Sequence, residues 1–373
     1  MRSRSLSDIM PRASGPRRVS NTKYYQLLVG LAIAAVFLYL TFGRLEWRSI
    51  QSALGAAMPG PLLFAFVFLA AGFFTRITRW WWMLRIFEPR LPLSNCIRPF
   101  LVSLAVNNTV PFRAGDLLRT VGFRDELRSP PMRVLGTLVI ERLLDLLVLL
   151  AFFFIGFIGL SSVAANRFPP LFINATIAIA AICLIGLLML LLLPNQVQQV
   201  FRWLSDRGWL GKHKTMIRAQ AWLLQLFDAL LLLRSPKLSF QLLALTILAW
   251  TFEGGVFGAV AWSLQADSAL LGPWFSLALG TLATLVPSSP GYVGTFDYFA
   301  MLGLISYGSN REVAAVFALL IHLLLWAPVT LIGAVLLATL QRRRKPLSDY
   351  EPEPSISPLN HRINCEGHPH IVV

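Results

Sequence analysis

Three ionisable side chains stand together inside a long apolar run, VIERLLDLLVLL at 139–150. Glu141 and Asp145 are four residues apart, so on a helix they share one face, with Arg142 beside them. Each ionised group at the centre of a bilayer costs ~2.5–3.5 kcal/mol, so the three must pair with other charges or face water. The pattern predicts a ligand-binding or proton-coupling site, or an internal salt bridge to Arg113 or Arg119. The two roles are compatible.

A second polar cluster, NNTVPFRAGDLLR at 107–119, interrupts another apolar stretch. Arg113 and Arg119 either hold a lipid phosphate, which guanidinium matches in a bidentate geometry, or reach out to the headgroups at the membrane surface. Asn107 and Asn108 either donate to a headgroup or cap backbone carbonyls freed where the helix breaks. From this cluster we assign to a substrate-binding site Asn107, Asn108, Arg113, Asp116 and Arg119, and to a helix break Pro111 and Gly115.

The third cluster is VPSSPGYVGTFD at 286–297. Backbone N–H groups at the start of a half-helix attract anions. Asp297 lies just inside the following helix, where a carboxylate either favours the helix dipole or contacts a substrate. Glu253 and His322 are single polar groups in apolar spans, and a lone buried histidine is more often a hydrogen-bonded packing residue. We assign to the substrate site Ser288, Ser289, Asp297, Glu253 and the three charges Glu141, Arg142 and Asp145, and to a second helix break Pro287, Pro290, Gly291 and Gly294.

The composition indicates the elements that carry these clusters. Of 373 residues, 56% are hydrophobic and 14% are charged, against about 25% charged residues in soluble domains. The net charge of +15 does not point to nucleic acid, because the arginines cluster beside apolar runs as the positive-inside rule predicts. We predict an all-α polytopic membrane protein with six full transmembrane helices, at 24–43, 60–82, 134–160, 171–193, 238–264 and 312–340.

Two further apolar stretches, 93–118 and 270–306, are broken by polar motifs and predict re-entrant helical hairpins, whose irregular backbone must be buried in protein or face a water-filled cavity. Arginines place both flanks of the first hairpin, and the end of the 60–82 span with Arg76 and Arg79, in the cytoplasm. Both termini are then cytoplasmic. The predicted domains are a basic tail at 1–23, a transmembrane domain at 24–341 containing a cytoplasmic amphipathic segment at 195–236, and a disordered tail at 342–373.

The two interrupted stretches resemble each other. Each has a proline and an apolar run, then a proline, a glycine and an aspartate in the same order, ending at Asp116 and Asp297. The first hairpin is predicted to enter from the cytoplasm and the second from outside. Inverted repeats with broken helices in corresponding positions point to a transporter's binding site near the bilayer midplane. The alternative is chance similarity between two apolar segments.

Known soluble catalytic patterns are missing. The sequence has no P-loop, GxSxG, HExxH or GxGxxG motif, so we expect no catalytic residue and no ATP-driven transport by this chain alone. The three cysteines form neither a disulfide framework nor a zinc spacing. We expect no metal and no cofactor.

NNTVPFRAGDLLR, ERLLDLL and PSSPGYVGTFD together resemble the lysylphosphatidylglycerol synthase transmembrane region, also called the flippase-like family. The resemblance covers roughly 25–340. It implies a helical bundle with broken helices around a lipid-accessible cavity. The motif residues that it favours are Arg113, Asp116, Glu141, Arg142, Asp145, Pro287, Gly291, Gly294 and Asp297. Because the chain ends at Val373 without an aminoacyl transferase domain, we expect that it does not make lysyl-phosphatidylglycerol itself.

Three functional hypotheses follow. The first is a lipid translocase or lipid-handling protein of the bacterial inner membrane, without enzymatic activity, whose partners are membrane lipids with an anionic or zwitterionic headgroup. The second is a membrane-embedded enzyme, or an accessory to a lipid-modifying enzyme, in polyprenyl-linked sugar, hopanoid or aminoacyl-lipid metabolism. The third is a structural scaffold whose buried charges only fix helix packing. None of the three involves nucleic acid.

Overall fold

The computed structural model describes residues 21–43, 47–110, 113–163, 170–192, 235–285 and 289–343, together with Gln196 and Gln199. Every regular element within these residues is a helix. Four of the described helices are long and apolar enough to cross a membrane, α3 (Pro59–Arg85), α7 (Pro131–Val163), α11 (Pro236–Ser263) and α14 (Arg311–Arg343). They support a polytopic helical membrane protein, and they coincide by length and composition with four of the six predicted spans.

Local sequence explains where several of these helices begin. α3, α7 and α11 each start at a proline, Pro59, Pro131 and Pro236. A proline is favoured in the first turn because the N–H that it lacks would have no partner within the helix there. At the start of α11 the side chain of Ser235 also accepts a hydrogen bond from the N–H of Leu238.

The other two predicted spans are also helical. α1 (Asn21–Phe42) begins slightly before the predicted position 24, and α8 (Pro170–Leu192) matches the span at 171–193. The apolar stretches identified among the described side chains cover only part of each helix, Ala32–Phe42 and Thr176–Met189. Whether these two helices cross the bilayer therefore stays a prediction. Residues 1–20, almost all of the predicted amphipathic segment at 195–236, and residues 344–373 lie outside the described part of the chain.

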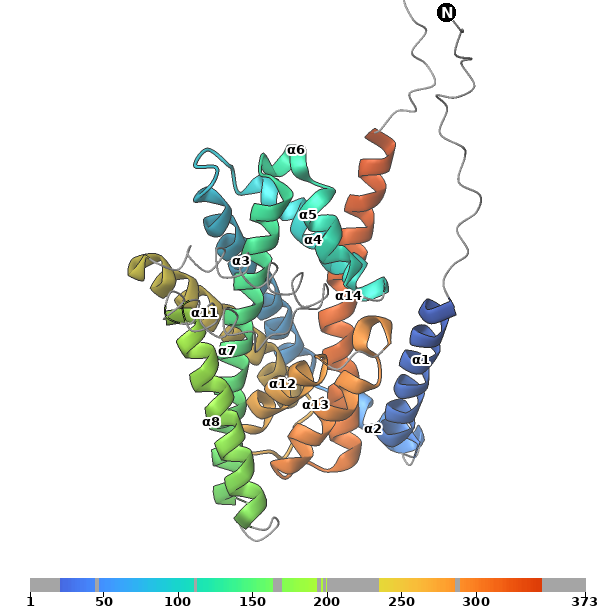
Figure 1. Ribbon diagram of the computed structural model, residues 1–373. Helices are drawn as coiled ribbons and strands as arrows, with labels where there is room; N and C mark the ends of the chain where they lie inside the picture. The colour runs from blue at the N-terminus through green and yellow to red at the C-terminus, as the bar shows by residue number, and fades with distance from the viewer. Residues whose placement is uncertain are drawn as a thin grey trace, which may run out of the picture.

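Each interrupted apolar stretch forms a pair of short helices that pack against each other. The first pair is α4 (Ser94–Thr109) and α5 (Ala114–Val121), followed by the single turn α6 (Arg124–Leu127). The second is α12 (Gly272–Ala283) and α13 (Thr295–Ser306), with the 3₁₀ turn η3 (Pro290–Tyr292) between them. We call these pairs the first and the second hairpin. In Figure 1 they lie toward opposite ends of the bundle, with their breaks facing each other near its middle.

The hairpins exchange packing partners between the two halves of the chain. α3 packs along α11, α4 packs on α14, and α12 packs on α7. Each half thus consists of a long helix, a hairpin and a second long helix. The first helix of each hairpin lies on the second long helix of the other half, while α13 also packs on α14 of its own half. This arrangement agrees with the predicted internal repeat, because two repeats related by a twofold axis make such reciprocal contacts.

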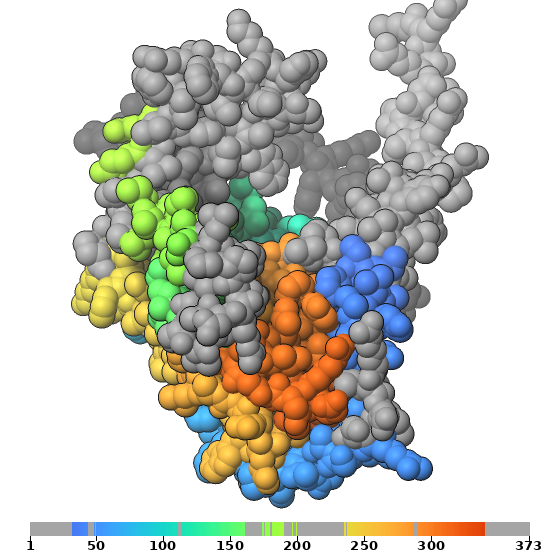
Figure 2. Space-filling view, turned by 90° about the horizontal axis from the view of Figure 1, so that it is seen from below, coloured from blue at the N-terminus to red at the C-terminus, as the bar shows by residue number. Residues whose placement is uncertain are grey.

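The surface of the bundle is apolar, as a bilayer requires. Leu63 in α3, Ile182 in α8, Phe240 in α11 and Leu331 in α14 each expose more than 60% of their surface. Seen from below in Figure 2, the second hairpin, in orange, occupies the middle of the face, with α1 on one side and α8 on the other. A short helix that the sequence analysis did not predict, α2 (Trp47–Gly55), packs against α14.

Candidate functional site

A buried ion pair joins α3 to α7 in the interior. Nη1 of Arg79 donates to Oδ1 of Asp145 at 2.6 Å and to Oγ1 of Thr246 at 2.8 Å. Nη2 of Arg79 donates to Oδ2 of the same carboxylate at 3.3 Å. Nε1 of Trp250 in α11 adds a further donor to Asp145 at 3.1 Å. Arg79 is completely buried, so this pair connects three long helices out of contact with solvent.

Arg119 of α5 makes the second buried ion pair. Its Nη2 donates to Oε2 of Glu141 at 3.2 Å, and its side chain is 1% exposed. The guanidinium lies 3.6 Å from the centroid of the Trp80 ring and 4.6 Å from that of Phe100. Cation–π contacts of this kind strengthen when the cation is desolvated. They fix the first hairpin against α3, and Trp80 is itself held by a hydrogen bond from its Nε1 to Thr137 at 3.0 Å.

These two ion pairs can be compared with two predictions from the sequence. The proposed salt bridge from span three to Arg119 is present, whereas Asp145 pairs with Arg79, which the positive-inside argument had placed among the cytoplasmic arginines. Arg79 is therefore buried rather than exposed at the membrane surface, while the cytoplasmic orientation predicted for this end of α3 stays a prediction. The positions of arginines locate the end of a helix only approximately. Arg79 lies about two turns inside α3, opposite a carboxylate whose attraction offsets the free-energy cost of burying the guanidinium.

Arg142, Asp116 and Asn107 form a second, more accessible group. Nη2 of Arg142 lies 3.3 Å from Oδ2 of Asp116, and the two side chains are 41% and 22% exposed. Nδ2 of Asn107 donates to Oδ1 of Asp116 at 2.8 Å, while the backbone N–H of Asp116 donates to Oδ1 of Asn107 at 3.2 Å. This reciprocal pair connects the end of α4 to the start of α5 and so defines the geometry of the first break.

The close approach of α4 and α5 depends on Gly115. A Cβ atom at this position would lie 1.9 Å from the backbone oxygen of Ser103 and 2.8 Å from Oδ1 of Asn107. No side chain fits there without moving the helices apart. Gly115 therefore lies in the second position of α5 as a contact residue rather than at the break itself, which falls between Val110 and Ala114.

The breaks of the two hairpins meet each other. Arg113, in the left-handed region with a φ of 51°, donates from Nε to Oη of Tyr292 at 3.2 Å. Gly291 adopts a φ of 68°, and a Cβ atom built on it would lie 3.2 Å from the backbone oxygen of Asn108. That oxygen also accepts a hydrogen bond from Nε1 of Trp326 at 3.3 Å. The two interrupted motifs thus form one junction inside the bundle.

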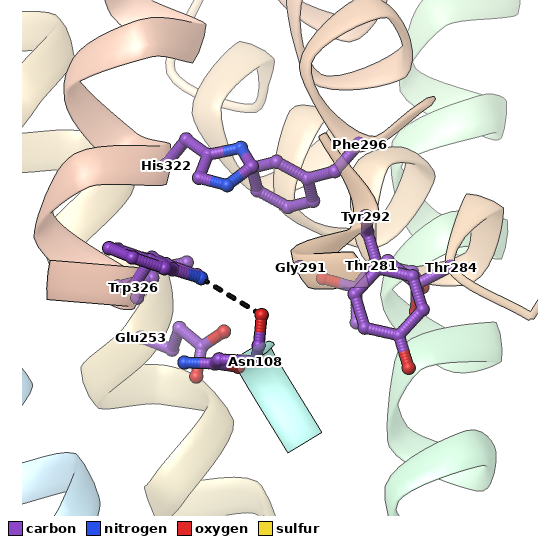
Figure 3. Close-up of a pocket in the computed structure, with 10 residues that line it drawn as sticks. Asn108, Glu253, Thr281, Thr284, Gly291, Tyr292, Phe296, His322 and Trp326 are labelled. Carbon is purple, nitrogen blue, oxygen red and sulfur yellow. Dashed lines mark hydrogen bonds between the residues drawn. The ribbon is translucent and has the colours of Figure 1, made fainter. Parts of the chain in front are cut away.

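A pocket of about 170 Å³ opens at this junction. Both hairpins, α11 and α14 contribute to its wall. The lining residues are Asn108, Glu253, Thr281, Thr284, Gly291, Tyr292, Phe296, His322, Leu325 and Trp326. Figure 3 shows Trp326, Glu253 and Asn108 along one side, Tyr292 and the two threonines on the opposite side, and His322 with Phe296 across the upper edge.

Glu253 contributes a carboxylate to the pocket. Its Oε2 lies 2.6 Å from Nη1 of Arg76, and the two side chains are 12% and 14% exposed. The Arg76 guanidinium lies 4.6 Å from the ring centroid of Trp250. Because Trp250 also donates to Asp145, the pocket wall and the buried ion pairs are connected through one indole.

Asp297 performs the capping role considered from sequence. Its Oδ2 accepts the N–H of Gly294 at 2.8 Å, across the first turn of α13. Its other oxygen, Oδ1, lies 2.7 Å from Nδ1 of His322 in α14. The same carboxylate therefore caps a half-helix and holds an imidazole that lines the pocket.

The predicted residues thus separate into groups. The pocket is lined by Asn108, Glu253 and Gly291, with Arg113 and Asp297 directly behind its wall. Arg119, Glu141 and Asp145 belong to the buried ion pairs, and Asn107, Asp116 and Arg142 to the group at the first break. Ser289 donates to the backbone oxygen of Val293 at 2.9 Å, while Pro290 and Gly294 delimit η3 and α13. Pro111, Pro287 and Ser288 lie outside the described residues.

Sequence reasoning undervalued the contribution of α14 to this pocket. His322 was interpreted as a packing residue, and Trp326 and Tyr292 were not singled out. The available signal was the spacing of His322 and Trp326, which are four residues apart and so project from one face of a helix. A polar group and an indole that share a face inside an apolar span indicate a cavity on that side.

Comparison with known families identifies the chain. Residues 27–333 match the model of the lysylphosphatidylglycerol synthase transmembrane region. The match spans most of the chain, including both hairpins, α3, α7, α11 and the larger part of α14, so the protein belongs to this family, as its motifs predicted. It is an integral membrane protein. A comparison with curated protein sequences gave no match.

Proposed function

We propose that this protein moves an amphiphilic lipid between the leaflets of a bacterial inner membrane. The headgroup passes through the pocket at the junction of the two hairpins while the acyl chains stay in the surrounding bilayer. The observation that carries the proposal is the meeting of two helix breaks, from opposite ends of an apolar bundle, at a pocket lined by a carboxylate, an imidazole and amide and hydroxyl groups.

Physical chemistry supports this role for the pocket. Unpaired backbone at membrane depth is tolerated where protein or a water-filled cavity satisfies it, and each break here does face the pocket. Half-helices that end near the middle of an inverted repeat are where secondary transporters bind their substrates. Asn108 and Tyr292 place polar atoms at that point, and Thr281 and Thr284 add hydroxyl groups.

The buried ion pairs have a different role in this proposal. Arg79 and Arg119 are completely buried, and both already pair with a carboxylate of α7. A phosphate could reach them only if those pairs broke, which costs several kcal/mol for each buried ion. We therefore assign Arg79, Arg119, Glu141 and Asp145 to the scaffold that holds the hairpins. Arg113, which points to the junction, is the arginine placed to meet a headgroup.

The test is lipid scrambling in vesicles that contain the purified protein. The phospholipids carry a fluorescent label on an acyl chain or on the headgroup, and dithionite added outside the vesicles reduces the labels that reach the outer leaflet. The rate of fluorescence loss measures translocation, and protein-free vesicles give the background. We expect translocation above background and a loss of at least tenfold in Glu253→Gln, which removes the pocket carboxylate's charge. The matched control is Glu126→Gln, whose ion pair with Arg98 lies outside the pocket and is about 30% exposed.

The outcomes separate translocation from the other two hypotheses. Rates equal to background for all phospholipid and glycolipid probes would contradict translocation and favour an accessory or structural role. Equal losses in Glu253→Gln and Glu126→Gln would show that the pocket is not the route. An orientation with both termini in the cytoplasm is part of the proposal.

A further inference from the structure

The wall of the pocket contains a histidine–carboxylate pair that the proposed headgroup route leaves unexplained. Nδ1 of His322 lies 2.7 Å from Oδ1 of Asp297, and their side chains are 14% and 5% exposed. Capping of α13 needs only one oxygen of Asp297, and the Gly294 N–H occupies it. The second oxygen orients the imidazole, a side chain that changes its charge near neutral pH.

The geometry leaves the far side of the imidazole available to the pocket. Because Nδ1 faces the carboxylate, Nε2 is the nitrogen that remains, and no other described residue forms a hydrogen bond with it. The ring of Phe296 stands at 84° to the imidazole, 5.7 Å away between centroids, and fixes its tilt. Trp326 follows one turn later on the same face of α14. In Figure 3 the imidazole extends from α14 over the pocket, beside Phe296.

The charges around the pair define what a proton would change. Glu253 of α11 is neutralised by Arg76 of α3. Arg113 and Tyr292 lie at the junction, bonded to each other. The other groups that line the pocket are uncharged amide, hydroxyl, apolar and indole side chains. With a neutral imidazole the pair carries one negative charge, from Asp297, and with an imidazolium it carries none.

We propose that His322 and Asp297 bind a proton that accompanies a phosphate-bearing headgroup into the pocket. Protonation turns Nε2 from an acceptor into an N–H donor and cancels the negative charge behind it. A phosphate oxygen then accepts a charge-assisted hydrogen bond from Nε2, the stronger class of such bonds. The proton comes from water on the side where the headgroup enters, and returns to water when the headgroup leaves. This inference rests on the proposed function, to which it adds a coupling ion.

Thermodynamic linkage makes the proposal measurable without transport. If the phosphate favours the protonated imidazole, the proton must favour phosphate binding by the same factor. The probe is the imidazole ¹³C resonance of His322 in histidine-labelled full-length protein in micelles. The chain has five histidines, and the resonance that disappears in His322→Gln is assigned to His322. His370→Gln, in the C-terminal tail outside the described residues, is the control for the assignment.

We expect added phosphatidylglycerol to raise the midpoint of the pH dependence of the His322 resonance by about one pH unit, equivalent to about tenfold tighter proton binding. Asp297→Asn should shift the resonance itself, because it replaces the carboxylate that contacts Nδ1. It also provides the assignment by moving one resonance if His322→Gln does not fold. The same midpoint with and without lipid overturns the proposal.

Two further measurements identify the ligand and distinguish a failure of this inference from a failure of the proposed function. Inorganic phosphate that shifts the midpoint as much as phosphatidylglycerol would overturn the lipid headgroup as the ligand, whereas a shift with the lipid alone supports it. In vesicles, scrambling of phosphatidylglycerol should be about tenfold faster at pH 6 than at pH 8, and His322→Gln should remove this difference. Scrambling with an unchanged pH profile in the variant contradicts the inference alone. A midpoint that moves without any scrambling contradicts translocation alone.

Discussion

Arg79 and Asp145 form a 2.6 Å ion pair between α3 and α7, with the guanidinium completely buried. The pair is connected to the first hairpin through Glu141, one turn before Asp145, which holds Arg119. It is connected to the pocket wall through Trp250, which donates to Asp145 and lies against Arg76. Its consequences can be tested separately from any transport assay.

Asp145→Asn should destabilise the protein strongly, because it leaves the buried Arg79 guanidinium with only the more distant carboxylate of Glu141, 3.9 Å away, as a counter-charge. Removing one partner of a buried pair costs about 3–5 kcal/mol. Thermal unfolding in detergent, followed by fluorescence, should show a large fall in Tm. Replacing both partners with apolar residues, Arg79→Met with Asp145→Leu, should recover much of the loss. Glu126→Gln, in a partly exposed ion pair, should cost less than about 1 kcal/mol. Similar losses in Asp145→Asn and Glu126→Gln would contradict the burial argument.

Gly115→Ala should separate α4 from α5. The added Cβ atom would meet the Ser103 backbone oxygen at 1.9 Å, and a backbone atom cannot rotate away as a side chain does. Overpacking of this kind costs about 1–3 kcal/mol. The matched control is Gly258→Ala in α11, where nothing lies within 4 Å of the new atom and the higher helix propensity of alanine should leave stability unchanged or raised. If the two variants unfold at the same temperature, the close approach of the helices is wrong.

The contact between the hairpin tips can be measured with a double-mutant cycle. Tyr292→Phe removes the hydroxyl that accepts from Arg113, and Arg113→Gln removes the donor. We expect each single change to cost about 0.5–1.5 kcal/mol, and the double variant to cost less than the sum of the two. The free energy of unfolding in detergent gives the coupling. Strictly additive losses would mean that the two breaks do not interact.

Labelling from either side tests whether the hairpins enter from opposite faces. In a variant whose three native cysteines are serine, single cysteines replace Arg124, beyond the first hairpin, and Leu270, before the second, and both positions are exposed. A membrane-impermeant maleimide should label Leu270→Cys in intact cells, and Arg124→Cys after the inner membrane is inverted. Labelling of both from the same side would contradict the inverted arrangement.

The helical architecture was largely predictable because bilayer thickness imposes it. Apolar runs of about twenty residues marked the positions of α3, α7, α11 and α14, and prolines and glycines located the two breaks. The short helix α2 was missed because its nine residues give too short a pattern. Hydropathy alone does not reveal how the hairpins exchange partners, since apolar faces of similar composition are interchangeable in lipid.

Several residues that line the pocket could be predicted from the sequence, whereas the side chains with which the charged residues pair could not. Asn108 and Glu253 were expected at the substrate site and Gly291 at a helix break. Arg79, however, was counted among the cytoplasmic arginines, and His322 was interpreted as a packing residue. Which carboxylate meets which arginine depends on the rotation of each helix about its axis. That rotation follows from packing details such as the contact at Gly115, which no local pattern expresses. An ionisable residue in an apolar helix therefore indicates that a polar or charged partner exists, but the sequence does not show which residue that partner is.

The exchanged packing of the hairpins also bears on how the protein is made. α4 lies against α14, so the first hairpin is synthesised well before its partner, which lies close to the C-terminal end of the described chain. Until α14 arrives, Asn108 lacks both Thr330, to which its amide donates at 2.9 Å, and Trp326, which donates to its carbonyl oxygen. The polar groups at the first break therefore stay without these partners through most of translation.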